Sequence, residues 1–268
     1  AFMFQDRGAL GRAPVLIPMH FEDDFPVIGE SGKVPEVLTV LDTGYQYAAI
    51  NGSDDFSYKP DENGQITLKN FWEFNHQQMD DFWSVTENPG HLRLHSAKLS
   101  PTLFQAYNTL TQRTVGPRCA AEVTLRFAHM KNGDVAGIST FIGNYGFTGV
   151  KKENDQFYLI MMGRPANDTT VFGQFEYENP GLEYARVSIY GESICLRAEA
   201  DFTDKRDLSS FYYKEGDNWQ KLGIDQPMYF KMDLFTGCRF GLFYYSTEQT
   251  GGYVDFSKFQ FIWPEYVY

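Results

Sequence analysis

Two short stretches of the sequence carry a dense set of hydrogen-bonding side chains. WEFNH supplies Trp72, Asn75 and His76, and NTLTQR supplies Asn108, Gln112 and Arg113. On an extended strand, Asn108 and Gln112 would share one face and Arg113 would lie on the other. Amide and guanidinium groups donate hydrogen bonds to hydroxyl oxygens. We therefore expect this row to line either a sugar groove or an interface between domains.

Two aromatic residues could serve as platforms for a sugar ring. The flat side chain of Trp72 or of Tyr145 could stack on a pyranose. The alternative is a structural role, because tryptophan in a β-sandwich is on average deeply buried. His76, taken by itself, fits a hydrogen-bonded structural histidine better than a ligand. The sequence leaves both interpretations of these rings open.

Three acidic residues could approach one another if the first and last strands of a β-domain pair. They are Asp54 and Asp55, before the first expected strand, and Asp255 in the last. Calcium binds six to eight oxygen atoms, including those of carboxylates, so Asp55 and Asp255 are candidate ligands of a structural calcium ion. No dense acidic loop accompanies them, and solvated turn carboxylates are the alternative. No other cofactor is indicated.

The overall composition excludes several classes of function. The net charge is −12 and no Lys/Arg cluster is present, which argues against nucleic acid and an anionic membrane as partners. No apolar run approaches the roughly 20 residues that span a bilayer. The three cysteines, Cys119, Cys195 and Cys238, lack the spacing of a zinc site or a disulfide framework. The sequence does not indicate whether the protein is secreted, periplasmic or cytoplasmic.

The elements that must position these side chains are β-strands. In AAEVTLRF (120–127), apolar and polar residues alternate with the period of a half-buried strand. Further strands are expected over 185–202, interrupted near Gly191, and over 228–235, 239–246 and 254–263, with KNGD, ENDQ and KEGDN as turns. In RFGLFYYS only about half of the aromatic side chains can be exposed. The pattern predicts an all-β fold, an antiparallel β-sandwich of the jelly-roll type.

The chain divides near residues 40–52. Residues 1–40 are irregular and contain four prolines, so they are a poor candidate for a separate domain. We expect a terminal segment over 1–40, a linker over 41–52 and a sandwich over 53–268. Phe2, Met3 and Phe4 give the opening stretch AFMFQDRGALGR an apolar start, and we expect this stretch to pack against the sandwich or to pair with another copy of the chain.

Several separated blocks resemble, in the expected order, the C-terminal part of glycoside hydrolase family 43 enzymes, the β-xylosidases and α-L-arabinofuranosidases. DRGALGRAPVLIPM, DDFPVIG and GKVP are similar to the end of that family's five-bladed propeller. The blocks FWEFNHQQMDDFWSVTENPGHLRL, FQAYNTLTQRTVGP, MKNGDVAGISTFIGNYGFTGV and FTGCRFGLFYYSTEQTGGYVDFSKFQF are similar to its appended concanavalin-A-like sandwich. That sandwich is also classed as carbohydrate-binding module family 91, which implies xylan as the ligand.

The resemblance implies an accessory role for this chain. Family 43 enzymes invert the anomeric centre with three propeller carboxylates, and the acid and base stand about 6.5–9.5 Å apart. Because the matched segment begins after those blades, we expect the chain alone to be inactive. The implied partners are a catalytic propeller and a xylan-type polysaccharide or oligosaccharide. Arg12 aligns with an arginine that contacts the sugar in the family's pocket; the alternative is a salt-bridged loop arginine.

Two other functions remain open from the sequence. A self-sufficient concanavalin-A-like glycanase would carry closely spaced acids of the form ExDxxE on one strand, and EYE at 176–178 lacks the following Asp and Glu. A purely structural module would stabilise the propeller or an oligomer of the chain without binding sugar.

Overall fold

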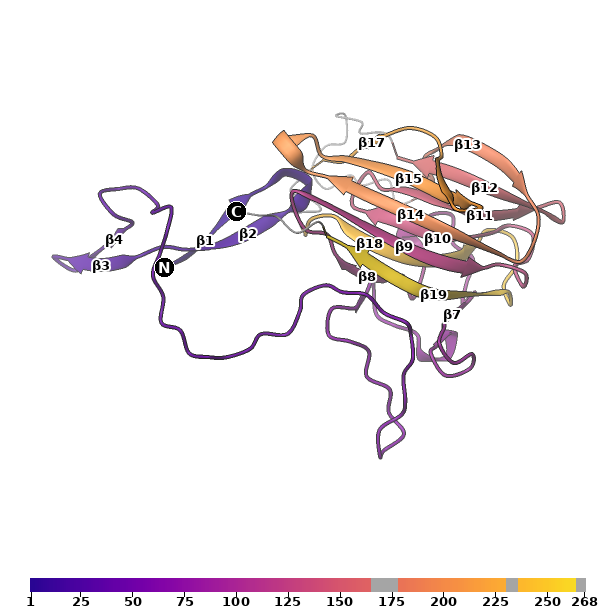
Figure 1. Ribbon diagram of the computed structural model, residues 1–268, viewed down its shortest axis with the longest axis horizontal. Coiled ribbons are helices and arrows are strands. Elements are labelled where there is room, and N and C mark those ends of the chain that lie inside the picture. Colours follow the sequence, from indigo (N-terminus) through magenta and orange to yellow (C-terminus); the bar gives the residue numbers. More distant parts are fainter. Residues whose placement is uncertain (165–177, 230–235, 264–268) are drawn as a thin grey trace.

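The computed structural model describes residues 1–164, 178–229 and 236–263, which form an antiparallel β-sandwich preceded by two separate hairpins (Figure 1). The strand expected over 228–235 falls mostly on residues 230–235, outside the described residues. Regular helix in the described ranges is limited to four short 3₁₀ turns, η1 (Gly8–Leu10), η2 (Asp80–Phe82), η3 (Leu103–Gln105) and η4 (Thr203–Lys205). None of the helices in these ranges is long and apolar enough to cross a membrane.

The sandwich consists of two stacked sheets. The seven-stranded sheet has the order β13 (Leu182–Ile189), β12 (Gln156–Gly163), β11 (Gly146–Glu153), β10 (Asp134–Phe141), β18 (Arg239–Ser246), β8 (Leu110–Arg113) and β5 (Glu73–Phe74). The other sheet has the order β16 (Asn218–Lys221), β15 (Leu208–Glu215), β14 (Ser193–Asp201), β9 (Arg118–Arg126), β19 (Tyr253–Ile262), β7 (Leu92–His95) and β6 (Trp83–Ser84), with β17 (Gln226–Pro227) on β15. The expected all-β sandwich is confirmed.

Alternating residues produce the strands where the sequence predicts them. In β9, Ala121, Val123 and Leu125 are buried, whereas Glu122 and Thr124 on the opposite face are partly exposed. Side chains of successive residues point to opposite faces of a sheet, so this strand has one apolar and one polar face. The other alternating segments form β13, β14, β18 and β19.

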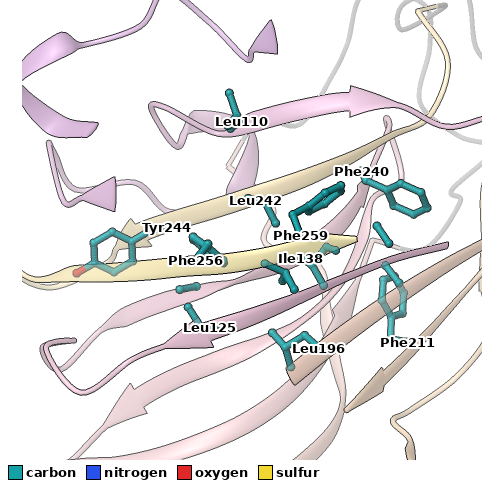
Figure 2. Close-up of a cluster of buried hydrophobic side chains, with 14 of the residues drawn as sticks. Leu110, Leu125, Ile138, Leu196, Phe211, Phe240, Leu242, Tyr244, Phe256 and Phe259 are labelled. Atoms are coloured by element: carbon teal, nitrogen blue, oxygen red, sulfur yellow. The ribbon is translucent and has the colours of Figure 1, made fainter. Parts of the chain in front are cut away.

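The main core lies between the two sheets. Figure 2 shows Leu242 and Ile138 from the seven-stranded sheet close to Phe256, Leu125 and Leu196 from the other sheet. Because burial of apolar surface is the dominant favourable contribution to folding, this layer holds the two sheets together. Cys119 and Cys238 belong to it as free cysteines, and burial raises the pKa of the Cys119 thiol to about 12.

A second apolar cluster covers the outer face of the seven-stranded sheet, the face turned away from the other sheet. Leu103 and Phe104 of η3 and the following Ala106 pack on side chains of that face, which are Val135, Tyr145, Phe147, Ile160, Phe243 and Tyr245. Strand β18 is therefore buried on both faces. None of its four aromatic residues is exposed, although alternation alone would have allowed half of them to be.

The N-terminal segment forms two hairpins beside the sandwich, β1 (Phe2–Asp6) with β2 (Arg12–Leu16) and β3 (Met19–Glu22) with β4 (Phe25–Ile28). The opening stretch 1–12 contacts the sandwich as expected, but not through Phe2, Met3 and Phe4, whose side chains are 80%, 51% and 60% exposed. The chain docks instead through η1, where Ala9 is fully buried. Pairing of the apolar strand with another copy stays a prediction.

Substitution of Phe243 tests whether the outer cluster is a true core. Because Phe243 is fully buried, we expect Phe243→Ala to lower the free energy of unfolding by ~3–5 kcal/mol, as Phe256→Ala should between the sheets. Urea denaturation measures both, with Tyr190→Ala as the control because that side chain is 87% exposed. A loss for Phe243→Ala no larger than for Tyr190→Ala would contradict this description of the fold.

Candidate functional site

Trp72 and Gln112 fasten the irregular segment that leads into the sandwich. The Trp72 ring is 7% exposed and packs against Phe56 and Phe259 at centroid distances of 6.0 and 4.9 Å. The Gln112 side-chain amide accepts from Gly52 N at 3.0 Å and donates to Gly52 O at 3.1 Å. Trp72 therefore has no free face for a sugar, and the Gln112 amide is satisfied by the backbone.

The buried carboxylate of Asp54 organises the same segment. Its oxygens accept hydrogen bonds from Trp72 Nε1 at 2.8 Å, from Phe56 N at 2.9 Å and from the Tyr58 hydroxyl. Lys69 Nζ lies 3.1 Å from Asp54 Oδ1 and balances the charge. A buried carboxylate is tolerated only when it is paired and hydrogen-bonded, and Asp54 meets both conditions without a metal ion.

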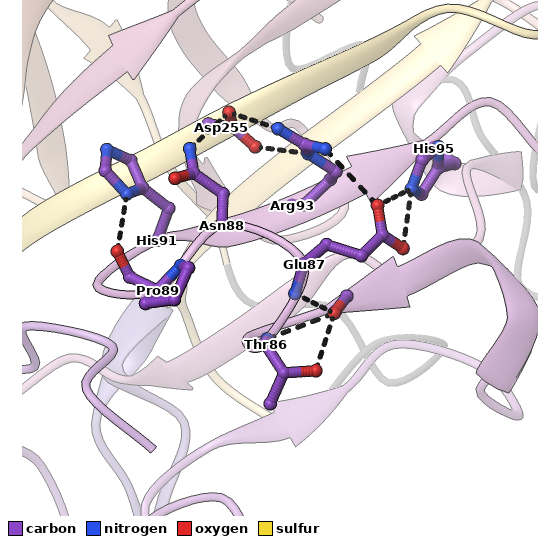
Figure 3. A network of polar contacts seen from close by, with 9 residues as sticks. Thr86, Glu87, Asn88, Pro89, His91, Arg93, His95 and Asp255 are labelled. Carbon is purple, nitrogen blue, oxygen red and sulfur yellow. Dashed lines mark hydrogen bonds and ion pairs between the residues drawn. The ribbon is translucent and has the colours of Figure 1, made fainter. Parts of the chain in front are cut away.

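Asp255 is likewise paired with a cation of the chain (Figure 3). Arg93 donates to it from Nε at 2.7 Å and from Nη2 at 2.9 Å, and Asn88 Nδ2 donates at 2.8 Å. Burial alone would raise the pKa of the Asp255 carboxyl, but the hydrogen bonds from Arg93 and Asn88 outweigh it and hold the pKa below the ordinary value of 3.8. Glu87 extends the network by contacting Arg93 and His95.

These arrangements do not fit the calcium site considered from the sequence. Asp255 and Asp54 direct their oxygens at nitrogen and hydroxyl donors, and Asp55 is exposed and accepts from Ser57 N at 3.0 Å. That backbone hydrogen bond lowers the pKa of Asp55. Within residues 1–164, 178–229 and 236–263, no group of three or more His, Cys, Asp or Glu side chains could hold a metal ion.

Tyr145 belongs to the outer cluster. Its ring is fully buried beside Phe104, at a centroid distance of 4.9 Å, and its hydroxyl donates to Pro180 O at 3.1 Å. Burial raises the pKa of the hydroxyl above its ordinary value. The ring therefore supports the sheet and offers no platform to a sugar.

Three further candidates, Asn75, His76 and Arg113, lie at or next to one pocket on the outer face of the seven-stranded sheet. The pocket has a volume of about 260 Å³ and is lined by Phe74, Asn75, Phe104, Thr111, Phe141, Ile142, Thr236, Gly237 and Arg239. His76 fixes one wall, since its Nε2 lies 2.5 Å from Phe104 O. Arg113 ends β8 directly opposite Arg239 of β18. Asn75 therefore lines the pocket, and Arg113 lies opposite one of the pocket's lining residues, Arg239.

Asn108 does not lie on the strand where the alternation placed it. It precedes β8 with φ of 56°, a left-handed conformation in which asparagine is enriched. Its side-chain amide accepts from Met79 N at 2.8 Å and donates to Met79 O at 3.0 Å. Asn108 therefore holds a loop in place and is nearly fully buried.

Arg239 is the functional candidate that the sequence reasoning missed. Its Nη1 lies 2.5 Å from Glu73 Oε2, whereas Nε and Nη2 are buried and have no hydrogen-bond partner. Burial lowers the pKa of this guanidinium below its ordinary value; Glu73 opposes the shift and the charge of Arg113 adds to it. The available signal was an arginine at the start of the otherwise apolar stretch RFGLFYYS.

Arg12 lies at the start of β2, next to the turn that docks on the sandwich. Its Nε is 2.9 Å from Asp6 Oδ1, and its guanidinium lies 4.3 Å from the centroid of the Phe4 ring. A side chain at the neighbouring Gly11 would come within 2.8 Å of Gly237 Cα, so this hairpin touches the loop that borders the pocket. The contact with Asp6 matches the salt-bridge alternative, and a role in sugar binding stays a prediction.

Comparison with known proteins identifies relatives of the whole described sandwich. Residues 61–262 match a family described as the beta-xylosidase C-terminal concanavalin A-like domain. A curated beta-xylosidase of Formosa agariphila is 26% identical over 279 residues, covering 94% of this chain and 43% of the relative. The chain thus spans less than half the length of this relative.

Two solved structures are similar over nearly the whole chain. A bifunctional GH43-CE protein of Bacteroides eggerthii superimposes with a TM-score of 0.82 at 36% identity, covering 97% of this chain and 32% of that protein. A GH43 glycoside hydrolase engineered to display both endo-xylanase and exo-arabinofuranosidase activity gives a TM-score of 0.80 at 26% identity, covering 97% and 51%.

The Arg93–Asp255 pair predicts a specific dependence of stability on pH. Because the folded pKa of Asp255 is depressed, its stabilisation is present above the unfolded value of about 3.9 and is lost as the pH falls through the folded value. We expect Asp255→Asn to be destabilising at pH 7 and the difference from wild type to shrink near pH 3, measured by urea denaturation. Asp217→Asn, in an exposed turn, is the control. A difference that is the same at both pH values would contradict this role.

Proposed function

The chain belongs to the family of beta-xylosidase C-terminal concanavalin A-like domains, and from this membership we propose that it is the accessory module of a xylan-type family 43 glycosidase. In this proposal it packs on a catalytic propeller, binds xylan or xylo-oligosaccharide, and has no hydrolytic activity of its own. The beta-xylosidase and GH43 relatives support the class of enzyme.

The distribution of exposed apolar side chains is the observation that carries the proposal. Most of the large exposed apolar side chains of the described residues lie between residues 2 and 50. On the two hairpins they are Phe2, Met3, Phe4, Leu16, Met19, Phe21, Phe25 and Ile28. A segment that exposes this many large apolar side chains is typical of an interaction site, and the resemblance of this segment to the end of a propeller supplies the partner.

The docked turn gives this apolar segment a fixed point on the sandwich. Ala9 N donates to Asp207 Oδ2 at 3.0 Å, and Cys238 N donates to Ala9 O at 2.7 Å. Gly11 and Gly237 approach too closely for a side chain at either position. A propeller that continued β1 and β2 would therefore be held beside the loop that borders the pocket.

The covered outer face of the seven-stranded sheet supports the proposal that the chain alone does not hydrolyse glycans. A glycanase on this scaffold would need an open cleft with alternating carboxylates, but aromatic residues and η3 cover the middle of this face. Of the acids in EYE, Glu176 lies outside the described residues and Glu178 is exposed. The self-sufficient glycanase is therefore the weaker alternative.

Burial of two candidate platforms favours a purely structural module as the second function. Trp72 is 7% exposed and Tyr145 is fully buried, so neither ring can stack on a sugar without rearrangement. In this alternative the module stabilises the propeller, and the pocket beside Arg239 takes no glycan.

Affinity electrophoresis in xylan distinguishes the two functions. We expect xylan to retard the wild-type chain and Phe141→Ala, in the pocket wall, to reduce the retardation severalfold, whereas Tyr190→Ala on the exposed surface should behave as wild type. The purified chain should not hydrolyse an aryl xyloside. Unchanged mobility in xylan would favour the structural module, and turnover that copurifies with the chain would contradict the accessory role.

A further inference from the structure

We propose that the pocket beside Arg239 binds the carboxylate of an acidic sugar, a uronic acid carried as a substituent on the glycan. This inference rests on the proposed function, because it assumes that the module meets a xylan-type polysaccharide. The inference adds a carboxylate to the expected ligand and names Arg239 as the residue that binds this carboxylate. Four observations on the described residues carry it: the free edge of one guanidinium, a second arginine beside it, the aromatic walls, and the size of the pocket.

The free edge of Arg239 has the geometry of a carboxylate receptor. Nε–H and Nη2–H lie along the same edge of a guanidinium and can donate two parallel hydrogen bonds to one carboxylate. Elsewhere in this chain Arg93 uses the same two atoms to hold Asp255, at 2.7 and 2.9 Å. In Arg239 both atoms are buried and without a partner, while Nη1 contacts Glu73. Buried donors without a partner cost free energy. Because Arg239 lines the pocket, a carboxylate that reached this edge after a small shift of the neighbouring side chains would recover that cost.

The charge around Arg239 is positive in an otherwise acidic protein. Arg113 lies directly opposite on the neighbouring strand, and like charges in such a position repel each other. Glu73 is the one acidic side chain in contact with Arg239 among the described residues, and it is half exposed. A second carboxylate would therefore neutralise the remaining positive charge, in a chain whose net charge is −12.

The walls of the pocket suit a sugar ring. Phe74, Phe104 and Phe141 line it together with Asn75, and Phe104 packs on Phe141 at a centroid distance of 5.4 Å. The rings can contact the C–H face of a pyranose, and an amide can bond to its hydroxyls. The volume of about 260 Å³ lies just below the range of about 300–1,000 Å³ typical of drug-sized ligands, which indicates a single ring.

A carboxylate side chain of the propeller is the competing occupant. The reason to consider it is that Gly237, which lines the pocket, contacts the docked N-terminal turn. Such a side chain would need the guanidinium but would leave the three phenylalanine walls without a role. The aromatic lining therefore favours the sugar, and the test below separates the two.

Calorimetric titration of the full chain tests the proposal. The probes are sodium glucuronate, glucose as the neutral ring, and acetate as the carboxylate without a ring. We expect wild type to bind glucuronate at least tenfold more tightly than either other probe. Arg239→Lys should lower the affinity for glucuronate at least tenfold, because lysine lacks the two parallel donors of the guanidinium. Added salt should lower the affinity of the wild type for glucuronate as well. Arg126→Lys, at an exposed arginine of the other sheet, should bind as wild type.

A second measurement does not depend on the folding of a variant. In the wild-type protein, glucuronate should shift the NMR signal of the Asn75 side-chain amide, and glucose at the same concentration should not. Equal binding of glucuronate and glucose, or no binding of glucuronate, would overturn the proposal. If, in addition, Arg239→Lys weakened association with the propeller, the carboxylate would come from the propeller.

Failure of this inference can be distinguished from failure of the proposed function. Retardation in xylan without binding of glucuronate would leave the accessory role standing and overturn the acidic-sugar site. Binding of glucuronate without retardation in neutral xylan would support the site and contradict binding of the unsubstituted chain.

Discussion

Burial of β18 on both faces is the constraint on which the rest of the structure depends. Phe240 and Leu242 point between the sheets, while Phe243 and Tyr245 point into the outer cluster. A strand of this kind must lie in the middle of a sheet, and the outer face must be covered by another segment. Residues 97–107 with η3 provide that cover, so the middle of the seven-stranded sheet is closed to a polysaccharide.

The covering segment ends near the start of β18, and the pocket with the unpaired donors of Arg239 lies there. Phe104 of the cover and Arg239 at the start of β18 both line the pocket. The same end of the strand receives the docked turn of the N-terminal segment through Cys238 and Gly237. The loop 236–238 therefore links three features: it leads into β18, contacts the docked N-terminal turn and lines the pocket.

The positions of most strands could be predicted from the sequence, but the hydrogen-bond and ion-pair partners of the polar residues could not. Alternation identified β9, β14 and β19 because the period of a strand is a local property. The partners of Asp255 and Trp72 are distant in sequence, since Arg93 is 162 residues from Asp255 and Asp54 is 18 residues from Trp72. The alternating pattern predicts a strand at Asn108, because a positive φ cannot be recognised from the order of apolar and polar residues. The unpaired donors of Arg239 are buried in a residue that lines the pocket together with Phe104 of η3, and no local pattern places η3 over β18.

Hydrogen exchange over residues 1–50 tests the central claim, that this segment is one half of an interface with a catalytic propeller. The measurement compares the chain alone with the same chain joined to a family 43 propeller, and the amides of β9 in the core serve as the internal reference. We expect η1 to be protected in both proteins, and the amides of β1–β4 to exchange at least tenfold more slowly when the propeller is present. Equal exchange of β1–β4 in the two proteins would contradict the claim.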